Sequence, residues 1–287
     1  MSVRAPAPAK INLTLKVGRP RADGLHPLQS VVAFMRGEEW VEAEPARDLS
    51  LTIIGPSADD LEADESNLVL RAARALQDAA GVAKGAALTL FKDYPVASGI
   101  GGGSSDAAAT LKALNALWRL DWSETRLAVL AQSLGSDVPV CVGARAAYMT
   151  GAGESFAPFD LPAMYAVLIN PRRPLPTASV YRQFDAQGLG GAFDPEAPAP
   201  IWRDRDGAIA GMRVLGNDLT PPAAALMPEL DTIAAMLRAD PRALHVGMSG
   251  SGATMFALCA NHEHAFALLQ AIVASNAAYW VRAGALT

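Results

Sequence analysis

The chain has 287 residues and a formal net charge of −5 at pH 7, and hydrophobic residues make up 51% of it against 18% charged. This length and composition predict a large core in about two domains, or one large domain, and exclude a disordered chain. The negative charge disfavours nucleic acid and anionic membranes as partners, and no apolar run is long enough to span a bilayer.

Apolar and polar side chains alternate along residues 9–17, the first expected element of the chain. The alternation predicts a half-buried strand with Lys10, Asn12, Thr14 and Lys16 on its other face. A turn over 18–24 follows. Further strands are predicted over 29–34, 39–44, 49–54 and 86–91, and helices over 67–80, 106–118 and about 123–134.

The second half of the chain continues the mixture of short strands and helices. Strands are predicted over 146–150, 165–170, 254–260 and 279–282, and helices over 221–237 and 264–275. Residues 188–200 are rich in Gly, Pro and Ala with few anchoring groups, which is typical of a mobile loop. Strands precede helices in each half, so the sequence predicts an α+β fold with antiparallel sheets and a boundary near residue 150.

The cysteines and the N-terminus bear on the compartment. Cys141 and Cys259 are far apart and lie among apolar neighbours, which is typical of buried free thiols in a reducing cytoplasm. Met1 to Lys10 contains neither a long apolar segment nor a cleavage pattern, so no signal peptide is expected. The prediction is therefore a cytoplasmic protein.

The most informative stretch is Pro95 to Ala109, which reads PVASGIGGGSSDAAA. Its glycines allow a ligand to approach the main chain, and the alanine run is a strong helix former. Ser104, Ser105 and Asp106 suit the cap or first turn of that helix. A flexible loop that leads into a helix start is a recurrent way to bind phosphate, because unpaired N–H groups and the positive end of the helix dipole face the ligand.

Two common nucleotide motifs do not fit this stretch. No Lys-Ser or Lys-Thr pair closes it, which excludes a Walker A loop. Ser104 stands where the dinucleotide fingerprint would have its third glycine, which excludes that motif as well. An idle glycine-rich surface turn is the remaining alternative, and the chain entropy that four glycines lose on folding disfavours it.

Two other segments also have an unusual composition, and a further turn can display a side chain. Pro8 to Asn12 places Lys10 on an amphipathic strand, although a solvent-facing lysine is the ordinary interpretation. Met248 to Ala253 contains small residues before an apolar strand, which is also typical of a tight turn. Asp137 lies in the turn Gly-Ser-Asp-Val-Pro, where an aspartate often serves the turn itself.

Taken together, the Lys10 segment, the 95–109 stretch and the 248–253 segment resemble the three motifs of the GHMP kinase superfamily in order and spacing. The stretches PAKINLTL, RADGLHPLQSV and GSDVP narrow the resemblance to a member that phosphorylates a hydroxyl of a cytidine diphosphate-linked polyol in non-mevalonate isoprenoid biosynthesis. The resemblance covers nearly the whole chain.

The resemblance implies a two-domain α+β fold. Residues 1–150 would form the N-terminal, ribosomal-protein-S5-like, ATP-binding domain, and residues 151–287 a ferredoxin-like C-terminal domain. The active site would lie in the cleft between them. The implied cofactor is ATP with Mg²⁺, without a dedicated protein metal site because no compelling carboxylate ligand is evident.

The resemblance also implies the roles of individual residues. Asp137 would be the catalytic base, and Lys10 would lower the pKa of the substrate hydroxyl and attract the γ-phosphate. The residues expected to bind ATP are Asn67, near the adenine, and Pro95, Val96, Ala97, Ser98, Gly99, Ile100, Gly101, Gly102, Gly103, Ser104 and Ser105. The residues expected to bind substrate are Asn12, His26, Thr177, Tyr181, Gly250 and Ser251.

In this scheme His26 contacts the cytosine ring and Tyr181 stacks on the same base, so that the base lies between two flat rings. The sequence departs from the family pattern at Leu25, where an aromatic residue is common, and at Ala97 and Ser98, where glycines are common. The first departure weakens one wall of the base pocket, and the second reduces the flexibility of the loop.

Two alternatives remain open. One is a homoserine or mevalonate-type kinase, against which the His26 and Tyr181 segments argue. The other is a non-catalytic sensor with the same fold, against which the presence of both Lys10 and Asp137 argues. The expected partner is a small-molecule substrate, with no nucleic acid and no membrane, and the chain is expected to be a monomer or a weak homodimer.

Overall fold

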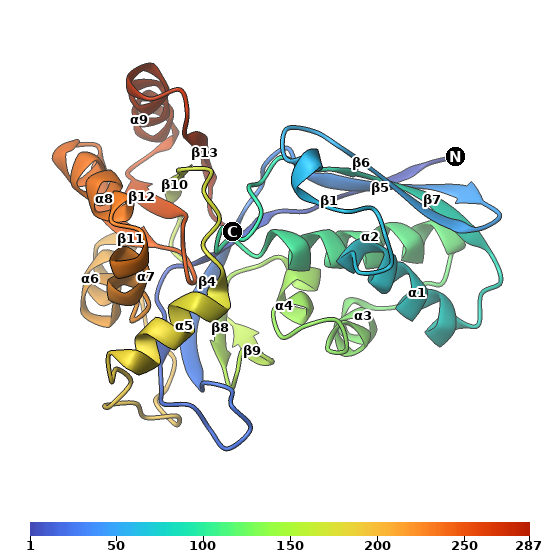
Figure 1. Cartoon of the computed structure of the whole chain (residues 1–287), viewed down its shortest axis with the longest axis horizontal. Coiled ribbons are helices and arrows are strands. Elements are labelled where there is room, and N and C mark those ends of the chain that lie inside the picture. Colours follow the sequence, from blue (N-terminus) through green and yellow to red (C-terminus); the bar gives the residue numbers. More distant parts are fainter. The chain divides into compact units, whose positions relative to one another are not determined.

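The computed structural model describes the whole chain, Met1–Thr287, and divides it into two compact units (Figure 1). Each unit is assembled from separated stretches. Unit 1 comprises Met1–Ala9, Arg36–Val96 and Gly101–Ala144, and unit 2 comprises Lys10–Met35, Ala97–Ile100 and Arg145–Thr287. The expectation of one family-domain boundary near residue 150 stays a prediction.

Unit 1 is built on a four-stranded sheet with the order β1-β5-β7-β6. Strands β1 and β5 are antiparallel, as are β5 and β7, but β6 and β7 are parallel. The expectation of purely antiparallel sheets is wrong for this pair, because helix α1 lies between the two strands in sequence and provides the crossover that parallel neighbours need. The strand bounds are β1 Val3–Pro6, β5 Trp40–Ala46, β6 Leu49–Ile54 and β7 Gly85–Phe91.

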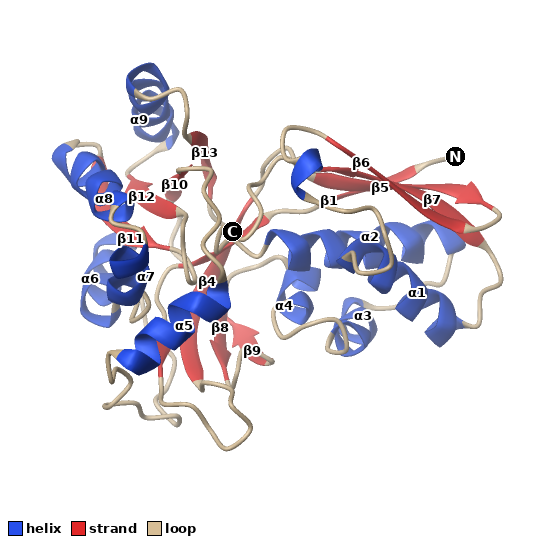
Figure 2. Cartoon of the chain, in the orientation of Figure 1, coloured by secondary structure: helices blue, strands red, loops and turns tan.

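Helices α1 to α4 of unit 1 lie on one face of this sheet (Figure 2). Helix α2 is central and contacts α1, α4 and β5. Its buried face carries small side chains, among them Ala107 and Ala109, which permit a close approach of helix to sheet. The bounds are η1 Ala58–Asp60, α1 Leu68–Ala80, α2 Gly102–Trp118, α3 Glu124–Ala131 and α4 Val138–Gly143.

Unit 2 contains two sheets. The first has the order β2-β4-β8-β9, with β3 paired to β4, and the second has the order β11-β12-β10-β13. All strand pairs of the second sheet are antiparallel, as predicted. The bounds are β2 Ala9–Asn12, β3 Lys16–Val17, β4 Leu28–Met35, β8 Ala147–Thr150, β9 Ser155–Pro158, β10 Tyr165–Asn170, β11 Ala243–Met248, β12 Met255–Cys259 and β13 Trp280–Ala285.

Five helices complete unit 2, and α8 and α9 pack on its second sheet. Buried side chains of α8 and α9, such as Leu237 and Leu268, join those of β10, such as Val167, in one hydrophobic core. None of the helices in the chain is long and apolar enough to cross a membrane. The bounds are α5 Thr177–Ala186, α6 Arg205–Leu215, α7 Thr220–Leu226, α8 Glu229–Ala239 and α9 His262–Ser275.

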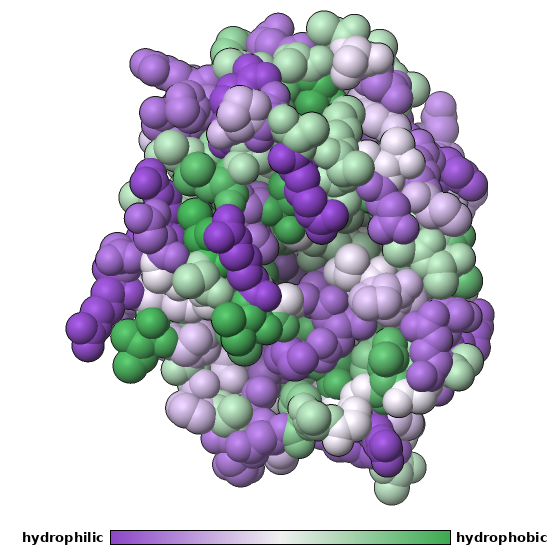
Figure 3. Space-filling view, turned by 90° about the vertical axis from the view of Figure 1, so that its left-hand side faces the viewer, coloured by the Kyte–Doolittle hydropathy of each residue, from purple (hydrophilic) through white to green (hydrophobic).

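On the side that carries α6, α8 and α9, the surface contains both hydrophobic and hydrophilic residues (Figure 3). Hydrophobic residues lie there in small groups among hydrophilic ones. Exposed apolar side chains on these helices include Val214 on α6 and Phe266 on α9. Scattered exposure of this kind is normal for a folded protein.

Helix ends with clear capping residues agree best with the sequence. Asn67 caps α1 by accepting a hydrogen bond from the N–H of Val69, and Gly81 ends the helix in the left-handed conformation. Both thiols are free and buried, as expected. The helix predicted over 221–237 is instead two helices, because Pro228 lacks an N–H and forces Met227 out of helical geometry.

Residues 188–200 form no helix or strand, as predicted, but the segment is better anchored than its composition suggests. Gln29 on β4 donates to the carbonyl oxygens of Asp194 and Ala197, and the hydroxyl of Tyr148 on β8 also donates to Ala197. The expectation of few anchoring groups is therefore wrong, because these donors come from strands distant in sequence.

Stability below neutral pH should depend on His245 of β11. Burial, with Arg213 and Arg238 nearby, lowers the pKa of His245 from 6.5 to about 4. The unfolded chain therefore binds a proton that the folded chain excludes between these two values, so the free energy of unfolding falls as the pH drops through this window. Between pH 7 and pH 5, the free energy of unfolding should therefore fall by about 2 kcal/mol less in His245→Gln than in the parent.

The measurement is urea denaturation of the parent and the variant at both pH values. His264→Gln is the matched control, because His264 is exposed at the start of α9. This substitution should leave the pH dependence of stability unchanged. An identical loss of stability in the parent and in His245→Gln would contradict the prediction.

Candidate active site

The glycine stretch leads into helix α2, which begins at Gly102 rather than at Asp106. Gly101 is the N-cap residue and has a left-handed conformation with φ 62°. The first hydrogen bond of the helix runs from the N–H of Ser105 to the carbonyl oxygen of Gly101 at 2.9 Å. The N–H groups of Gly102, Gly103 and Ser104 therefore have no acceptor within the helix, and this end favours an anion.

The loop before the helix has an alternating backbone. Ala97, Gly99 and Gly101 have positive φ values of 52°, 75° and 62°, whereas Ser98 and Ile100 between them do not. Alternation of this kind turns successive N–H groups to one side and is typical of anion-binding concavities. Gly99 must also lack a side chain, because a Cβ there would collide with the carbonyl oxygens of Ser249 and Gly252.

Unit 2 brings the three predicted motifs together. The hydroxyl of Ser249 donates to the carbonyl oxygen of Gly99 at 2.8 Å and accepts from the N–H of Asn12 at 3.0 Å. The N–H of Lys10 donates to Ile100 at 2.9 Å, and the N–H of Thr254 donates to Ser98 at 3.1 Å. The first and third motifs therefore hold the tip of the glycine loop, residues 97–100, from two sides.

Lys10 is buried, with 3% of its surface exposed. Its Nζ lies 3.3 Å from Oδ1 of Asn12, whose Nδ2 donates to the hydroxyl of Ser30 at 2.7 Å. The expectation of a half-buried strand is wrong for this segment, because both faces of residues 9–15 are covered. Burying an ammonium group is costly unless polar contacts compensate for the lost water, and the contact with Asn12 is one such contact of Lys10.

Asp137 belongs to unit 1 and is the N-cap residue of α4. Its side chain makes no capping hydrogen bond, and a proline stands in the first turn of the helix. The helix itself was missed by the sequence reasoning, which treated Gly135 to Pro139 only as a break. Asp137 is partly exposed.

The two serines of the glycine motif differ in their surroundings. The hydroxyl of Ser105 donates to the carbonyl oxygen of Pro8 at 2.6 Å, and the side chain is buried. Ser104 is partly exposed and is the better placed of the two to meet a ligand. The amide of Asn67 is used in the cap of α1 and in a hydrogen bond to Glu62, so its contact with adenine stays a prediction.

A buried ionic cluster of unit 1 was missed by the sequence reasoning. Nζ of Lys92 lies 2.6 Å from Oδ2 of Asp106 and 2.8 Å from Oε1 of Glu39, and all three side chains are almost fully buried. Oε2 of Glu39 accepts the N–H groups of Asp93 and Tyr94. The cluster therefore fixes the chain just before the glycine stretch and again within α2.

Charge balance in this cluster shifts the proton affinities of its members. Burial is the main cause that raises the pKa of Glu39, and the neighbouring Asp106 adds to it, while Lys92 opposes both. Burial by itself would lower the pKa of Lys92, but the two carboxylates raise it above the ordinary value. The lysine therefore stays charged. The sequence shows Lys92 a few residues before the glycine stretch but gives no sign of its partners Glu39 and Asp106.

Four predicted substrate contacts lie in unit 2 in two pairs. The rings of His26 and Tyr181 are 4.8 Å apart between centroids, and Phe184 lies 5.9 Å from His26. A base does not fit between rings at that separation, so the expected sandwich between His26 and Tyr181 is not present in this conformation. The hydroxyls of Thr177 and Ser251 form a hydrogen bond of 2.9 Å.

Asp185 is a further residue of this region that sequence reasoning missed. Its Oδ1 lies 2.9 Å from Nε2 of His26, and it follows Phe184 on α5. The helix was not predicted, so neither residue could be assigned to the face that meets His26. Leu25, the departure from the family pattern, is 52% exposed.

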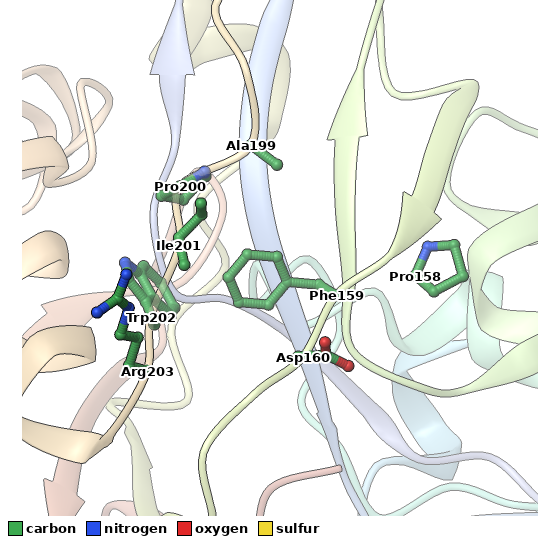
Figure 4. A pocket seen from close by; sticks show the side chains of 8 residues that line it. All are labelled: Pro158, Phe159, Asp160, Ala199, Pro200, Ile201, Trp202 and Arg203. Carbon is green, nitrogen blue, oxygen red and sulfur yellow. The ribbon is translucent and has the colours of Figure 1, made fainter.

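A separate hollow in unit 2 contains none of the predicted site residues (Figure 4). Phe159 and Trp202 meet there edge to face, with centroids 5.0 Å apart. The residues that line it are Pro158, Phe159, Asp160, Ala199, Pro200, Ile201, Trp202 and Arg203.

Two family models match the chain. The model described as GHMP kinases N terminal domain matches residues 67–145, and the model described as GHMP kinases C terminal matches residues 203–278. Curated relatives named 4-diphosphocytidyl-2-C-methyl-D-erythritol kinase are similar over nearly the whole length. The relative from Hyphomonas neptunium is 46% identical and is matched over 98% of this chain and 95% of its own length. The relative from Parvibaculum lavamentivorans is 44% identical, with 97% and 96% covered.

Solved structures agree in fold. A crystal structure of a 4-(cytidine 5'-diphospho)-2C-methyl-D-erythritol kinase has a TM-score of 0.76 and 34% identity, and it covers 99% of this chain and 98% of its own. A homoserine kinase from Cytophaga hutchinsonii has a TM-score of 0.68 at 19% identity, covering 99% and 94%. The second likeness shows the fold alone.

The two domains and the glycine loop define the class, that of the GHMP kinases, and the resemblance inferred from the sequence is confirmed. Within this class, the chain belongs to the 4-diphosphocytidyl-2-C-methyl-D-erythritol kinase family.

Replacing Ala97 with Gly should stabilise the protein. Ala97 has φ 52°, a conformation that costs a residue with a Cβ about 1–2 kcal/mol, and the extra freedom of glycine in the unfolded chain offsets part of the gain. We expect the free energy of unfolding to rise by about 0.5–1 kcal/mol, as measured by urea denaturation.

Ala75→Gly in the middle of α1 is the matched control, because the same change inside a helix should lower stability by about 1 kcal/mol. A loss of stability in Ala97→Gly of the size seen in this control would refute the assignment of strain to Ala97.

Proposed function

We propose that the protein transfers the γ-phosphate of ATP to the 2-hydroxyl of 4-diphosphocytidyl-2-C-methyl-D-erythritol, giving the 2-phosphate and ADP. The reaction belongs to non-mevalonate isoprenoid biosynthesis, in the cytoplasm. The observation that carries the proposal is the hydrogen-bonded meeting of the Lys10 segment, the tip of the glycine loop and the Ser249 loop. Membership of the kinase family supports the choice of reaction and substrate.

The ATP phosphates bind to the backbone of residues 95–105. The open N–H groups at the start of α2 and the alternating loop before it supply hydrogen bonds and partial positive charge. Local donors of this kind suit a chain whose net charge is −5. Asn67 borders the adenine. The N-terminal domain, residues 1–150, supplies most of this ATP site, and the C-terminal domain spans residues 151–287.

Mg²⁺ accompanies the nucleotide. No group of three or more His, Cys, Asp or Glu side chains in the chain is arranged to hold a metal ion. Mg²⁺ commonly keeps much of its water shell and binds to phosphate oxygens of the nucleotide, so the proposal needs no such group. Ser104 is the residue best placed to add a ligand. When bound, the ion neutralises charge on the β- and γ-phosphates.

Asp137 and Lys10 act on the reacting atoms. Asp137 accepts the proton of the substrate hydroxyl. The oxygen of this hydroxyl forms a bond to the γ-phosphorus while the bond from that phosphorus to the bridging oxygen of ADP breaks. Lys10 stabilises the negative charge on the transferred group. The burial of Lys10 supports this role, because electrostatic interactions are stronger where water is excluded.

The cytidine end of the substrate binds at His26 and Tyr181, with Asn12, Thr177, Gly250 and Ser251 as polar contacts. Ring contact between His26 and Tyr181 supports a shared aromatic surface, on which the base stacks from one side. The hydrogen bond between Thr177 and Ser251 supports a common polar patch.

The choice of substrate is tested by ADP release in a coupled assay with ATP and Mg²⁺. We expect turnover with 4-diphosphocytidyl-2-C-methyl-D-erythritol and none above background with homoserine or mevalonate. Turnover of homoserine or mevalonate in its place would overturn the substrate. Binding of the ligand in a calorimeter without ADP formation would instead favour a non-catalytic sensor.

The two catalytic assignments are tested by Asp137→Asn and Lys10→Met, which keep side-chain size. Each should lower kcat by about 10²–10⁴, the range for removal of a positioned proton-transfer group. Circular dichroism checks the fold, and calorimetry with ADP should give an affinity for Asp137→Asn close to that of the parent. Near-normal turnover in either variant would contradict the catalytic role of the residue that it replaces.

A further inference from the structure

A residue outside the third motif holds that motif in place. Asn217 lies between α6 and α7, and its Nδ2 donates to the carbonyl oxygens of Met248 and Gly250, each at 2.8 Å. Its Oδ1 accepts the N–H of Leu219 at 2.9 Å. Both donors and the acceptor of this amide are therefore used, and two of the three bonds go to residues 248–250.

Asn217 is itself fixed to the strand that follows Lys10 and Asn12. The N–H of Leu15 donates to Gly216, and the N–H of Asp218 donates back to Leu15, each at 2.8 Å. The carboxylate of Asp218 accepts from Nζ of Lys16 at 2.7 Å and from the N–H of Val17 at 2.9 Å. Residues 216–218 therefore connect the first motif to the third.

The segment that Asn217 holds has little conformational preference of its own. Gly250 and Gly252 have φ values of 55° and 82°, which only glycine adopts readily. Ser249 lies between the two carbonyls that Asn217 binds, and its hydroxyl meets Asn12 and Gly99. The place of Ser249 against the glycine loop therefore depends on bonds from outside the segment.

We propose that Asn217 is a positioning residue for ligand binding, which sets the place of Ser249 to Ser251 and through them the tip of the ATP loop and the polar substrate contacts. The proposal rests on the proposed function, because the ligands are those of the kinase reaction. An amide is required at this position. A carboxylate of the same shape has no N–H to donate and would repel the two carbonyl oxygens.

The experiment compares Asn217→Asp with Asn115→Asp, a matched control in the other unit. Asn115 also exchanges two hydrogen bonds with backbone, donating to the carbonyl of Trp122 and accepting its N–H, each at 3.1 Å. Both changes should lower the thermal midpoint. Only Asn217→Asp should raise KM for ATP and for the substrate, by about tenfold, the effect expected for two lost hydrogen bonds, with kcat changed by less than threefold.

A second measurement keeps the test independent of turnover. Calorimetry with ADP should show about tenfold weaker binding for Asn217→Asp and for the milder Asn217→Ala, and parental binding for Asn115→Asp. If Asn217→Asp does not fold, Asn217→Ala replaces it in both assays. Unchanged KM and ADP affinity in a folded Asn217 variant would overturn the proposal, as would an equal change in Asn115→Asp. Absence of turnover in the parent protein would count against the proposed function, whereas ADP binding would still test Asn217.

Discussion

The geometry of the candidate site depends on one serine hydroxyl that makes two hydrogen bonds at once. A hydroxyl can donate and accept together, and that of Ser249 serves the carbonyl of Gly99 and the N–H of Asn12, residues 150 and 237 positions away. The contact requires glycine at position 99, because the backbone of 249–252 lies directly against it. The shape of the ATP loop is therefore a tertiary property, only partly encoded in the loop itself.

Unit 1 contributes a second constraint of a different physical kind. The cluster of Lys92, Glu39 and Asp106 removes three ionisable groups from water, which is costly unless they are well paired. The cluster connects Lys92, before the glycine stretch, to Asp106 in helix α2 after it. Breaking such a buried cluster is generally more harmful than its pairwise attraction suggests, because the remaining charges stay buried. Hydrogen bonds thus fix the tip of the loop, and buried charge fixes its two ends.

Sequence periodicity recovered the elements that carry their own signals. Strands 49–54 and 165–170 have the predicted bounds, and α1 occupies the predicted range 67–80 except that Asn67 is its N-cap. The start of α2 was placed too late, because Gly102 and Gly103 resemble loop residues although they form the first helical turn. The burial of Lys10 was not predictable, since the segments that cover its strand lie far along the chain. Likewise, Glu39, Lys92 and Asp106 are far apart in sequence, and their ion pairs are evident only in the folded chain.

The discontinuous make-up of unit 2 has a consequence for the order in which the chain acquires its structure. Phe34 and Thr287 exchange two backbone hydrogen bonds of 2.9 Å, so one of the first strands ends against the last residue. Domains tend to fold as units during synthesis, and N-terminal parts fold first. Residues 10–35 therefore meet their partners in residues 145–287 only after those residues have been synthesised, so unit 2 is completed late.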